Sequence, residues 1–254
     1  MDIKKPLVAL GSAAAITAVA SQAQAGTITV SAASSLTNAV TEIAQNYEKS
    51  HAGDKVELNF AASGTLLQQL KHGAPVDVFI SADEKTMDQA QDANLLDKAT
   101  RADLLKNSLV LIAPKGSGLK INSLDDLKNT DVKRIAVGNP DSVPAGRYTK
   151  AALEKANLWD DLGDKVVNTQ NVRQALDYTA RKEVQVGFVF KTDALIMKDK
   201  VDILQEVPLS SDILYPVAQL QKAPEAKDAQ KFIEYLNSPE AIEVFKNYGF
   251  DSAK

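Results

Sequence analysis

The sequence has no cysteine, only two histidines among its 254 residues, an aromatic content of 6% and no excess of basic over acidic side chains. The absence of cysteine excludes disulfides and a lipid-modified cysteine of the kind that anchors some exported proteins. The 29 basic and 33 acidic side chains give a net charge of −4. This charge argues against nucleic acid as a partner, because nucleic-acid sites need basic patches.

Patterns typical of enzymes are also scarce. His51 and His72 stand in polar segments at predicted helix ends, where we expect surface residues rather than general bases or metal ligands. No cluster of histidine, aspartate and glutamate has metal-ligand spacing. Ser63 lacks the glycine two positions earlier that a nucleophile elbow requires, and Asp77 and Asp83 are expected to cap loops rather than to form an acid–base pair. We therefore expect a protein that is not an enzyme and that has no cofactor.

Residues 1–25 have the pattern of a secretory signal peptide. Lys4 and Lys5 precede an apolar run from Leu7 to Ala20, which is too short for a membrane span, and Ala23-Gln24-Ala25 forms a small-x-small cleavage site. Cleavage after Ala25 would remove two lysines and one aspartate, which changes the net charge from −4 to −5. We expect the remaining chain to be a periplasmic monomer.

Strand and helix patterns alternate along residues 26–254 and indicate an α/β fold. The predicted strands are Thr27–Val30, Val56–Phe60, Val76–Ile80, Ser108–Ala113, Arg134–Val137, Lys165–Asn168 and Val184–Phe190. Helices are expected after most of them, for example where Leu36, Val40, Ile43 and Tyr47 recur at helical spacing. Strand–helix units in this order predict parallel pairing of the strands.

We expect two lobes, because the chain is long enough for two cores. The chain is predicted to cross into the second lobe around Ser108–Lys120 and to return at Leu214–Ala218. This gives a first lobe of residues 26–107 and 217–254 and a second lobe of residues 108–216. Each lobe should contain a mixed, mainly parallel sheet flanked by helices, and two strands should join the lobes as a hinge.

Four strand-to-helix loops are candidate anion sites, and they contain Ser35, Ser63, Ala145 and Val172. At the second loop a strand ends in small residues and a helix begins, with Ser63 or Thr65 as its expected N-cap. Helix starts present unpaired N–H groups and the positive end of the helix dipole, and ligands of open α/β sheets bind at this edge. Because none of the four residues is cationic, the loops favour a fully ionised tetrahedral oxyanion, whose oxygens all accept hydrogen bonds. Serine is also a common simple cap, so a purely structural role stays open at this point.

At these same loops the sequence resembles the periplasmic molybdate-binding proteins of ABC transporters. The segments that carry the resemblance are Ala33–Ala39, Phe60–Leu66, Gly73–Asp83, Val143–Gly146, Asn171–Arg173 and Phe245–Phe250. The resemblance extends over essentially the whole of residues 26–254. It implies a type II periplasmic-binding-protein fold that closes on molybdate or tungstate and delivers the anion to a membrane permease.

The resemblance also implies roles for individual residues. Ser35 and Ser63 would donate to the anion through hydroxyl and backbone N–H groups, and Ala145 and Val172 through backbone N–H groups alone. Molybdenum would therefore be held only as its oxyanion. The alternatives are a binding protein for sulfate or for a small carboxylate and, from a different class, a secreted hydrolase. A carboxylate receptor should carry an arginine fork, for which Arg173 is a candidate, although Arg173 could equally be a surface charge.

Phe190 departs from the family pattern, which has a tyrosine at this position whose hydroxyl also reaches the anion. A lost hydrogen bond to a charged group costs roughly 1.5–3 kcal/mol, or about ten- to a hundredfold in affinity. Lys191, Arg147 or a water molecule could replace the missing donor. Without a replacement, the sequence predicts a lower affinity.

Overall fold

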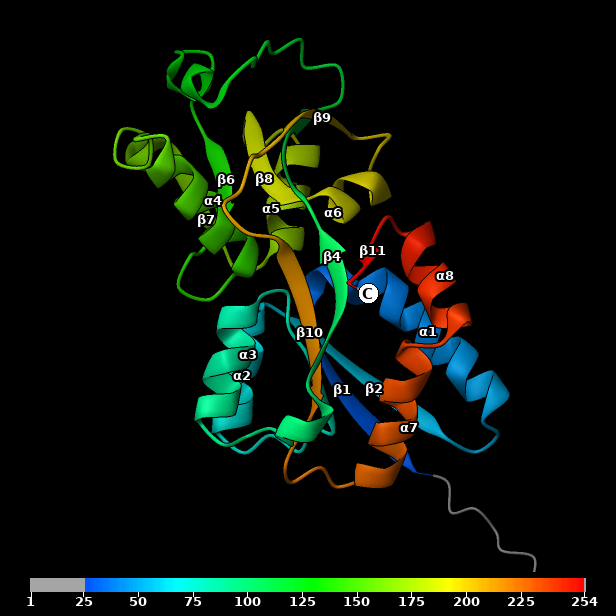
Figure 1. Cartoon of the computed structure of the whole chain (residues 1–254). Coiled ribbons are helices and arrows are strands. Elements are labelled where there is room, and N and C mark those ends of the chain that lie inside the picture. Colours follow the sequence, from blue (N-terminus) through cyan, green and yellow to red (C-terminus); the bar gives the residue numbers. More distant parts are fainter. Residues whose placement is uncertain (1–25, 254) are drawn as a thin grey trace, which may run out of the picture.

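The computed structural model describes residues 26–253, so the predicted signal peptide and its cleavage site lie outside the described residues. The described chain folds into two lobes, each built on one β-sheet (Figure 1). No helix in this part of the chain is long and apolar enough to cross a membrane.

The first sheet has six strands in the order β11-β4-β10-β3-β1-β2. These are β1 (Thr27–Ala33), β2 (Lys55–Ala61), β3 (Val78–Ile80), β4 (Ala102–Asn107), β10 (Ile213–Gln219) and β11 (Asp251–Ser252). Parallel pairing is confined to β1 with its neighbours β2 and β3, whereas β10 and β4 join antiparallel. Alternate residues Ile28, Val30 and Ala32 of the central strand β1 are fully buried, so the apolar face of this strand forms the core of the lobe.

The second sheet has five strands in the order β7-β6-β8-β5-β9. These are β5 (Leu109–Pro114), β6 (Ile135–Gly138), β7 (Val166–Thr169), β8 (Val186–Phe190) and β9 (Val201–Glu206). Here β6 pairs parallel with β7 and β8, and β5 pairs antiparallel with β8 and β9. Both sheets are mixed, as expected. Their parallel part is smaller than predicted, because the strands that enter and leave each lobe run antiparallel to their neighbours.

Helices cover both sheets (Figure 1). In the first lobe α1 (Thr37–Ser50), α7 (Ala226–Leu236) and α8 (Pro239–Asn247) pack against one another, and α2 (Ser63–Lys71) packs against α3 (Glu84–Asp92). The second lobe contains α4 (Pro144–Lys155), α5 (Val172–Ala180) and α6 (Lys191–Ile196). Short 3-10 helices are η1 (Ser34–Leu36), η2 (Lys98–Thr100), η3 (Leu124–Lys128) and η4 (Gly163–Lys165). Val40, Ile43 and Tyr47 of α1 are fully buried, which confirms the face predicted from their spacing.

Two strands connect the lobes, as expected for a hinge. The chain passes from the first sheet to the second at Ser108, between β4 and β5, and returns in residues 207–212, between β9 and β10. β4 and β10 lie side by side and pair antiparallel (Figure 1). The predicted return at Leu214–Ala218 therefore lies within β10, after the change of sheet, because these residues already pair with the first sheet. The lobe boundaries 26–107, 108–216 and 217–254 stay a prediction.

Candidate functional site

The four predicted loops follow strands that are neighbours in each sheet. Ala33 at the end of β1 pairs with Ala61 at the end of β2, so η1 with Ser35 and the start of α2 with Ser63 emerge side by side. In the second sheet Gly138 of β6 pairs with Thr169 of β7, and α4 and α5 follow these two strands. Ala145 and Val172 are the second and first residues of those helices. Each lobe thus contributes two adjacent helix starts.

Contacts between the lobes show that the two pairs of helix starts face one another. The backbone N–H of Gly64 donates to the carbonyl of Ser142 at 2.9 Å, which joins the start of α2 to the loop before α4. The guanidinium of Arg173 donates to the carbonyl of Ser35 at 3.0 Å, which joins the start of α5 to η1. A crevice of about 360 Å³ opens between the start of α2 and the loops before α4 and α5, lined by Ala61, Ala62, Thr65, Asn139, Ser142, Asn168, Thr169, Gln170 and Asn171.

The approach of the backbones is closest at Gly64. A Cβ atom on this residue would lie 2.7 Å from the carbonyl oxygen of Ser142 in the other lobe. Real Cβ atoms do not make contacts this short. The two lobes therefore meet backbone to backbone at this point, and only glycine allows the observed separation.

The four backbone N–H groups at the predicted positions are buried donors that lack an acceptor. Ser35, Ser63, Ala145 and Val172 are 2%, 0%, 0% and 3% exposed. None of their N–H groups has a hydrogen-bond partner within residues 26–253. The first N–H groups of a helix have no partner inside the helix, yet more than 90% of buried backbone N–H groups in folded proteins are paired. Four such donors at facing helix starts indicate a place for an acceptor from outside the chain.

The two serine hydroxyls do not cap their helices. Ala62 is the N-cap of α2 and no side chain caps it, so the prediction that Ser63 or Thr65 fills this role is wrong. Ser63 Oγ accepts instead from the backbone N–H of Ala82 at 3.0 Å. The hydroxyl of Ser35, which caps no helix either, lies 3.0 Å from that of Tyr215. The simple structural role considered for serine therefore does not apply at either position.

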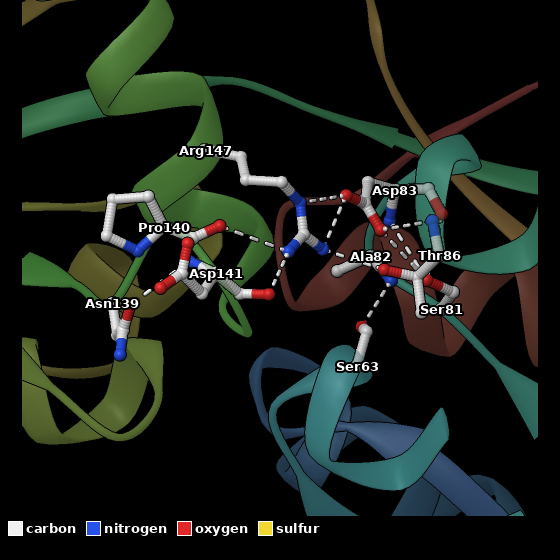
Figure 2. Close-up of polar contacts among 9 residues, drawn as sticks. All are labelled: Ser63, Ser81, Ala82, Asp83, Thr86, Asn139, Pro140, Asp141 and Arg147. Carbon is white, nitrogen blue, oxygen red and sulfur yellow. Dashed lines mark hydrogen bonds and ion pairs between the residues drawn. The ribbon is translucent and has the colours of Figure 1, made fainter. Parts of the chain in front are cut away.

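An arginine, Arg147, bridges the lobes near Ser63 (Figure 2). Nε and Nη2 of Arg147 on α4 contact Asp83 Oδ2 at 2.7 Å, and Nη2 also donates to Thr86 Oγ1 at 2.7 Å. Nη1 donates to the carbonyls of Pro140 and Asp141, both at 3.3 Å. The side chains of Arg147 and Asp83 are 15% and 5% exposed, so this ion pair is largely removed from water. All three guanidinium nitrogens of Arg147 thus bond to protein oxygens, separately from the four unpaired backbone N–H groups.

A second arginine bridges the lobes beside Ser35. Nε of Arg173 pairs with Asp193, which belongs to the same lobe. Its Nη1 donates to Asn38 Oδ1 at 2.8 Å and its Nη2 to the Ser35 carbonyl, both in the first lobe. Asp193 is fully buried, and burial raises the pKa of its carboxyl while Arg173 opposes that rise. Arg173 is therefore neither the surface charge nor the free fork considered from the sequence, because its guanidinium is occupied by these three acceptors.

Phe190 lies where β8 ends, beside the two helix starts of the second lobe. Its side chain is 1% exposed and meets the rings of Tyr215 and Tyr148 edge-on, with centroids 5.8 and 6.4 Å apart. Lys191 is a candidate replacement donor. Its Nζ lies 4.0 Å from Oε2 of Glu206, and the Lys191 side chain is 48% exposed. Tyr215 brings a hydroxyl to this region that sequence analysis did not anticipate.

The residues set aside from catalysis have structural roles. Asp77 accepts the backbone N–H groups of Thr29 and Glu225, both at 2.8 Å, and Asp83 caps α3, so both cap loops as predicted. His51 stacks on Tyr47 with ring centroids 4.0 Å apart, and the described part of the chain holds no group of three His, Cys, Asp or Glu residues that could bind a metal ion.

Comparisons with known proteins relate the chain to bacterial solute-binding proteins. A family model described as bacterial extracellular solute-binding protein matches residues 28–251. The molybdate-binding protein ModA of Escherichia coli (strain K12) is 44% identical over 234 residues, 90% of either chain. The putative ABC transporter substrate-binding lipoprotein YvgL of Bacillus subtilis (strain 168) is 40% identical over 226 residues, 88% of this chain and 86% of that protein. A solved structure, the substrate binding domain of a putative molybdenum ABC transporter from Clostridium difficile, aligns with a TM-score of 0.68 and 36% identity over 90% of this chain and 99% of that one.

Proposed function

Because the chain belongs to the family of bacterial extracellular solute-binding proteins, we propose that it binds molybdate or tungstate between its lobes and delivers the anion to an ABC transporter permease. Its two lobes with mixed sheets form the type II periplasmic-binding-protein fold. Family membership supports solute binding in general, and the names of the relatives at 44% and 36% identity support this class of anion.

The observation that carries the proposal is the set of four buried N–H groups without acceptors. Together with the hydroxyls of Ser35 and Ser63 they form a neutral donor set drawn from both lobes. A tetrahedral dianion offers acceptors in every direction and brings no hydrogen of its own that would need an acceptor. A protonated anion would bring such a hydrogen, and burying it unpaired is costly. The site therefore favours a fully deprotonated oxyanion, and selection between molybdate and the smaller sulfate would depend on the size of the cage.

A carboxylate ligand fits the site less well. Carboxylate receptors commonly use a bidentate arginine, and the two arginines at this interface, Arg147 and Arg173, already have their guanidinium groups bonded to protein acceptors. A ligand would have to displace Asp83 or Asp193 to reach them. A hydrolytic role has no support in the family assignment.

Anion binding is proposed to stabilise the closed arrangement of the lobes. The donors come from both lobes, so an ion that contacts all four can do so only when the lobes are together. Small-angle scattering should show compaction of the protein on addition of saturating molybdate. An unchanged radius of gyration, with binding confirmed on the same sample, would contradict hinge closure.

We further propose that the protein works in the periplasm after removal of residues 1–25 by cleavage after Ala25. The pattern of that segment supports export, and relatives include a protein named as an ABC transporter substrate-binding lipoprotein. Mass spectrometry of the protein recovered from the periplasm of an expressing bacterium should give a chain that begins at Gly26. A chain that begins at Met1 would contradict the proposed cleavage.

The function is tested by calorimetric titration of the dialysed chain from residue 26 with molybdate, tungstate and sulfate in parallel. We expect one-to-one binding of molybdate and tungstate, with sulfate much weaker. Binding of none of the three would refute the proposed cargo and leave the fold assignment intact, and tight binding of sulfate alone would assign the site to the runner-up anion.

The Phe190→Tyr variant tests the departure from the family pattern. A tyrosine hydroxyl at this position would add one donor to the site, and a hydrogen bond to a charged group contributes roughly 1.5–3 kcal/mol. We expect molybdate to bind the variant more tightly by calorimetry. Equal affinity would show that the missing donor is already replaced in the wild type.

A further inference from the structure

A series of hydrogen bonds runs from the half-buried Asn107 at the hinge to the buried Ser35. Nδ2 of Asn107, the last residue of β4, donates to the hydroxyl of Tyr215 on β10 at 3.1 Å and to Thr192 Oγ1 on α6 at 2.9 Å. The Tyr215 hydroxyl in turn lies 3.0 Å from Ser35 Oγ. Tyr215, Thr192 and Ser35 are no more than 2% exposed, so water has little access to the bond between Tyr215 and Ser35, whereas Asn107 is half-buried. These hydrogen bonds connect β4, β10 and α6 of the second lobe to Ser35, one of the proposed donors of the anion site.

The orientation of the Asn107 amide decides which group donates in each of these hydrogen bonds. The backbone N–H of Ser108 donates to Asn107 Oδ1 at 2.9 Å, and an N–H group can only donate. This bond fixes which side-chain atom of Asn107 is oxygen, so the amide nitrogen must be the atom that faces Tyr215. An amide nitrogen has two hydrogens and accepts none, and both hydrogens have acceptors here.

The direction then passes through Tyr215 to Ser35. Tyr215 accepts from Asn107, and within residues 26–253 Ser35 Oγ is the acceptor in reach of the Tyr215 hydrogen, so donation from Tyr215 to Ser35 satisfies this buried hydroxyl. Burial raises the pKa of the Tyr215 hydroxyl well above its ordinary value, so the hydroxyl keeps that hydrogen. Ser35 Oγ is then an acceptor towards Tyr215, and the hydrogen of Ser35 has no acceptor among residues 26–253. Ser63 is in the same situation, because the N–H of Ala82 occupies its oxygen as an acceptor.

We propose that Tyr215 and Asn107 are positioning residues that orient the hydroxyl hydrogen of Ser35 towards the bound oxyanion. The inference rests on the proposed function. In it both serine hydroxyls donate to the anion, one directed by Tyr215 and the other by the N–H of Ala82. Each serine then presents its hydrogen to the anion, and this arrangement favours an anion oxygen that accepts over one that carries a hydrogen. Residues that do not touch the anion thus contribute to the preference for a fully deprotonated oxyanion.

A cycle of conservative variants tests whether Tyr215 acts through Ser35. Molybdate affinities of the wild type, Ser35→Ala, Tyr215→Phe and the double variant are measured by calorimetry. Ser35→Ala removes a donor to a charged group and should weaken binding roughly ten- to a hundredfold, while Tyr215→Phe should weaken it roughly two- to tenfold. In the Ser35→Ala background Tyr215→Phe should have no further effect. An equal loss in both backgrounds would show that Tyr215 contacts the anion itself and would overturn the positioning role.

A variant that reverses the direction of the hydrogen bonds from Asn107 to Ser35 gives a second test. In Asn107→Asp the side chain is a carboxylate that only accepts, so Tyr215 would donate to it and Ser35 would donate to Tyr215. The Ser35 hydrogen would be lost to the anion, and molybdate affinity should fall at least tenfold. Protonation of the introduced carboxylate at lower pH would make this side chain a donor again and should restore affinity relative to the wild type measured at the same pH.

Combining Asn107→Asp with Tyr215→Phe distinguishes repulsion by the added negative charge from the effect of the reversed hydrogen bonds. Without the tyrosine hydroxyl, Ser35 has no acceptor at that side and its hydrogen returns to the anion. The double variant should therefore bind molybdate more tightly than Asn107→Asp alone, although it lacks one more polar group. If Asn107→Asp lowers molybdate affinity by the same factor in the wild type and in Tyr215→Phe, charge repulsion explains the effect and the inference is wrong.

Failure of the proposed function looks different. A wild type that binds none of the oxyanions would refute the function and, with it, this inference. A wild type that binds molybdate with no coupling between Ser35 and Tyr215 would leave the function standing and remove only the positioning role. Thermal unfolding of the four ligand-free proteins of the first cycle confirms that each is folded before its affinity is interpreted.

Discussion

The two ends of the interface between the lobes are closed by arginines in different ways. At the Ser63 end, Arg147 forms its ion pair with Asp83 across the interface, so the charges separate when the lobes part. At the Ser35 end, Arg173 keeps its carboxylate partner Asp193 within its own lobe and reaches across only to neutral oxygen atoms of Ser35 and Asn38. The comparison indicates that the first arginine contributes mainly to closure and the second mainly to the stability of its lobe. Substitutions at the two ends should separate these contributions.

The largest effect is expected from Arg173→Met. This change leaves Asp193 fully buried without its counter-charge, and breaking a buried pair in this way costs about 3–5 kcal/mol of unfolding free energy. Urea unfolding of the ligand-free protein measures the loss. Arg147→Met is the matched control, since Asp83 can become hydrated when the lobes open, and it should lower the unfolding free energy by less than about 1 kcal/mol. Equal losses for the two variants would contradict the comparison.

A companion change sharpens the first result. Combining Arg173→Met with Asp193→Asn removes the unpaired charge, so most of the lost stability should return. No recovery in this double variant would show that the packing of the arginine stem, rather than the charge pair, stabilises the lobe.

The next largest effect is expected from Ser63→Ala at the opposite end. This variant loses a hydroxyl donor to the anion, and we expect the free energy of molybdate binding to weaken by roughly 1.5–3 kcal/mol, or ten- to a hundredfold in affinity. Calorimetry with molybdate gives the change. Ser117→Ala, at an exposed residue after β5 in the other lobe, is the control and should bind like the wild type. An unchanged affinity in Ser63→Ala would remove this loop from the site.

A smaller effect on affinity is expected from Arg147→Met. The closed form loses an ion pair that the open form does not contain, which should weaken molybdate binding by about 1 kcal/mol, or roughly fivefold. Added salt should weaken the wild-type complex more than the variant complex, because salt screens the pair in one protein only. Calorimetric titrations at two salt concentrations test both statements. Identical salt dependence would show that the pair contributes nothing to closure.

The smallest effect concerns Glu84, which follows Asp83 at the start of α3 and pairs with Arg101. Burial, and then a hydrogen bond with Asp103, raise the pKa of Glu84 from 4.5 to about 7. The folded protein therefore holds a proton that the unfolded chain releases, so this contribution is complete below pH 4.5 and is lost as the pH rises towards 7. With the side chain 36% exposed, the contribution should stay below about 1 kcal/mol. Urea unfolding across this pH range should show a slope in the wild type that is reduced in Glu84→Gln, and identical slopes would contradict the shift.

Much of the fold could be predicted from local patterns. Each of the seven predicted strands overlaps an observed one, because their apolar residues either alternate, as in β2, or form a short apolar run bounded by turn residues, as in β5. The strands β4 and β9 were missed, since Ala102–Asn107 and Val201–Glu206 mix polar and apolar residues without a clear period. Their antiparallel pairing depends on partners far along the chain, about which local periodicity says nothing.

The site could be predicted only as far as its loops. Ser35 and Ser63 stand out because small polar residues follow a strand, but their hydrogen-bond partners do not. Tyr215 lies 180 positions from Ser35, and no local feature links them. The two arginines did leave a signal. Arg147 and Arg173 occupy the first turns of α4 and α5, where a cation opposes the helix dipole, and such misplaced charges predict a compensating partner elsewhere.

The close approach of Gly64 to Ser142 has a mechanical consequence. This contact acts as a stop, because the backbones touch there and the lobes can come no nearer. The stop sets the smallest enclosure that the facing helix starts can form. In the proposed site it therefore sets the smallest ion that can contact all of the donors at once. A methyl group at residue 64 would move the stop outward and shift the site towards larger ions. If the proposed site holds, the glycine at the backbone contact between the lobes contributes to discrimination by ionic radius.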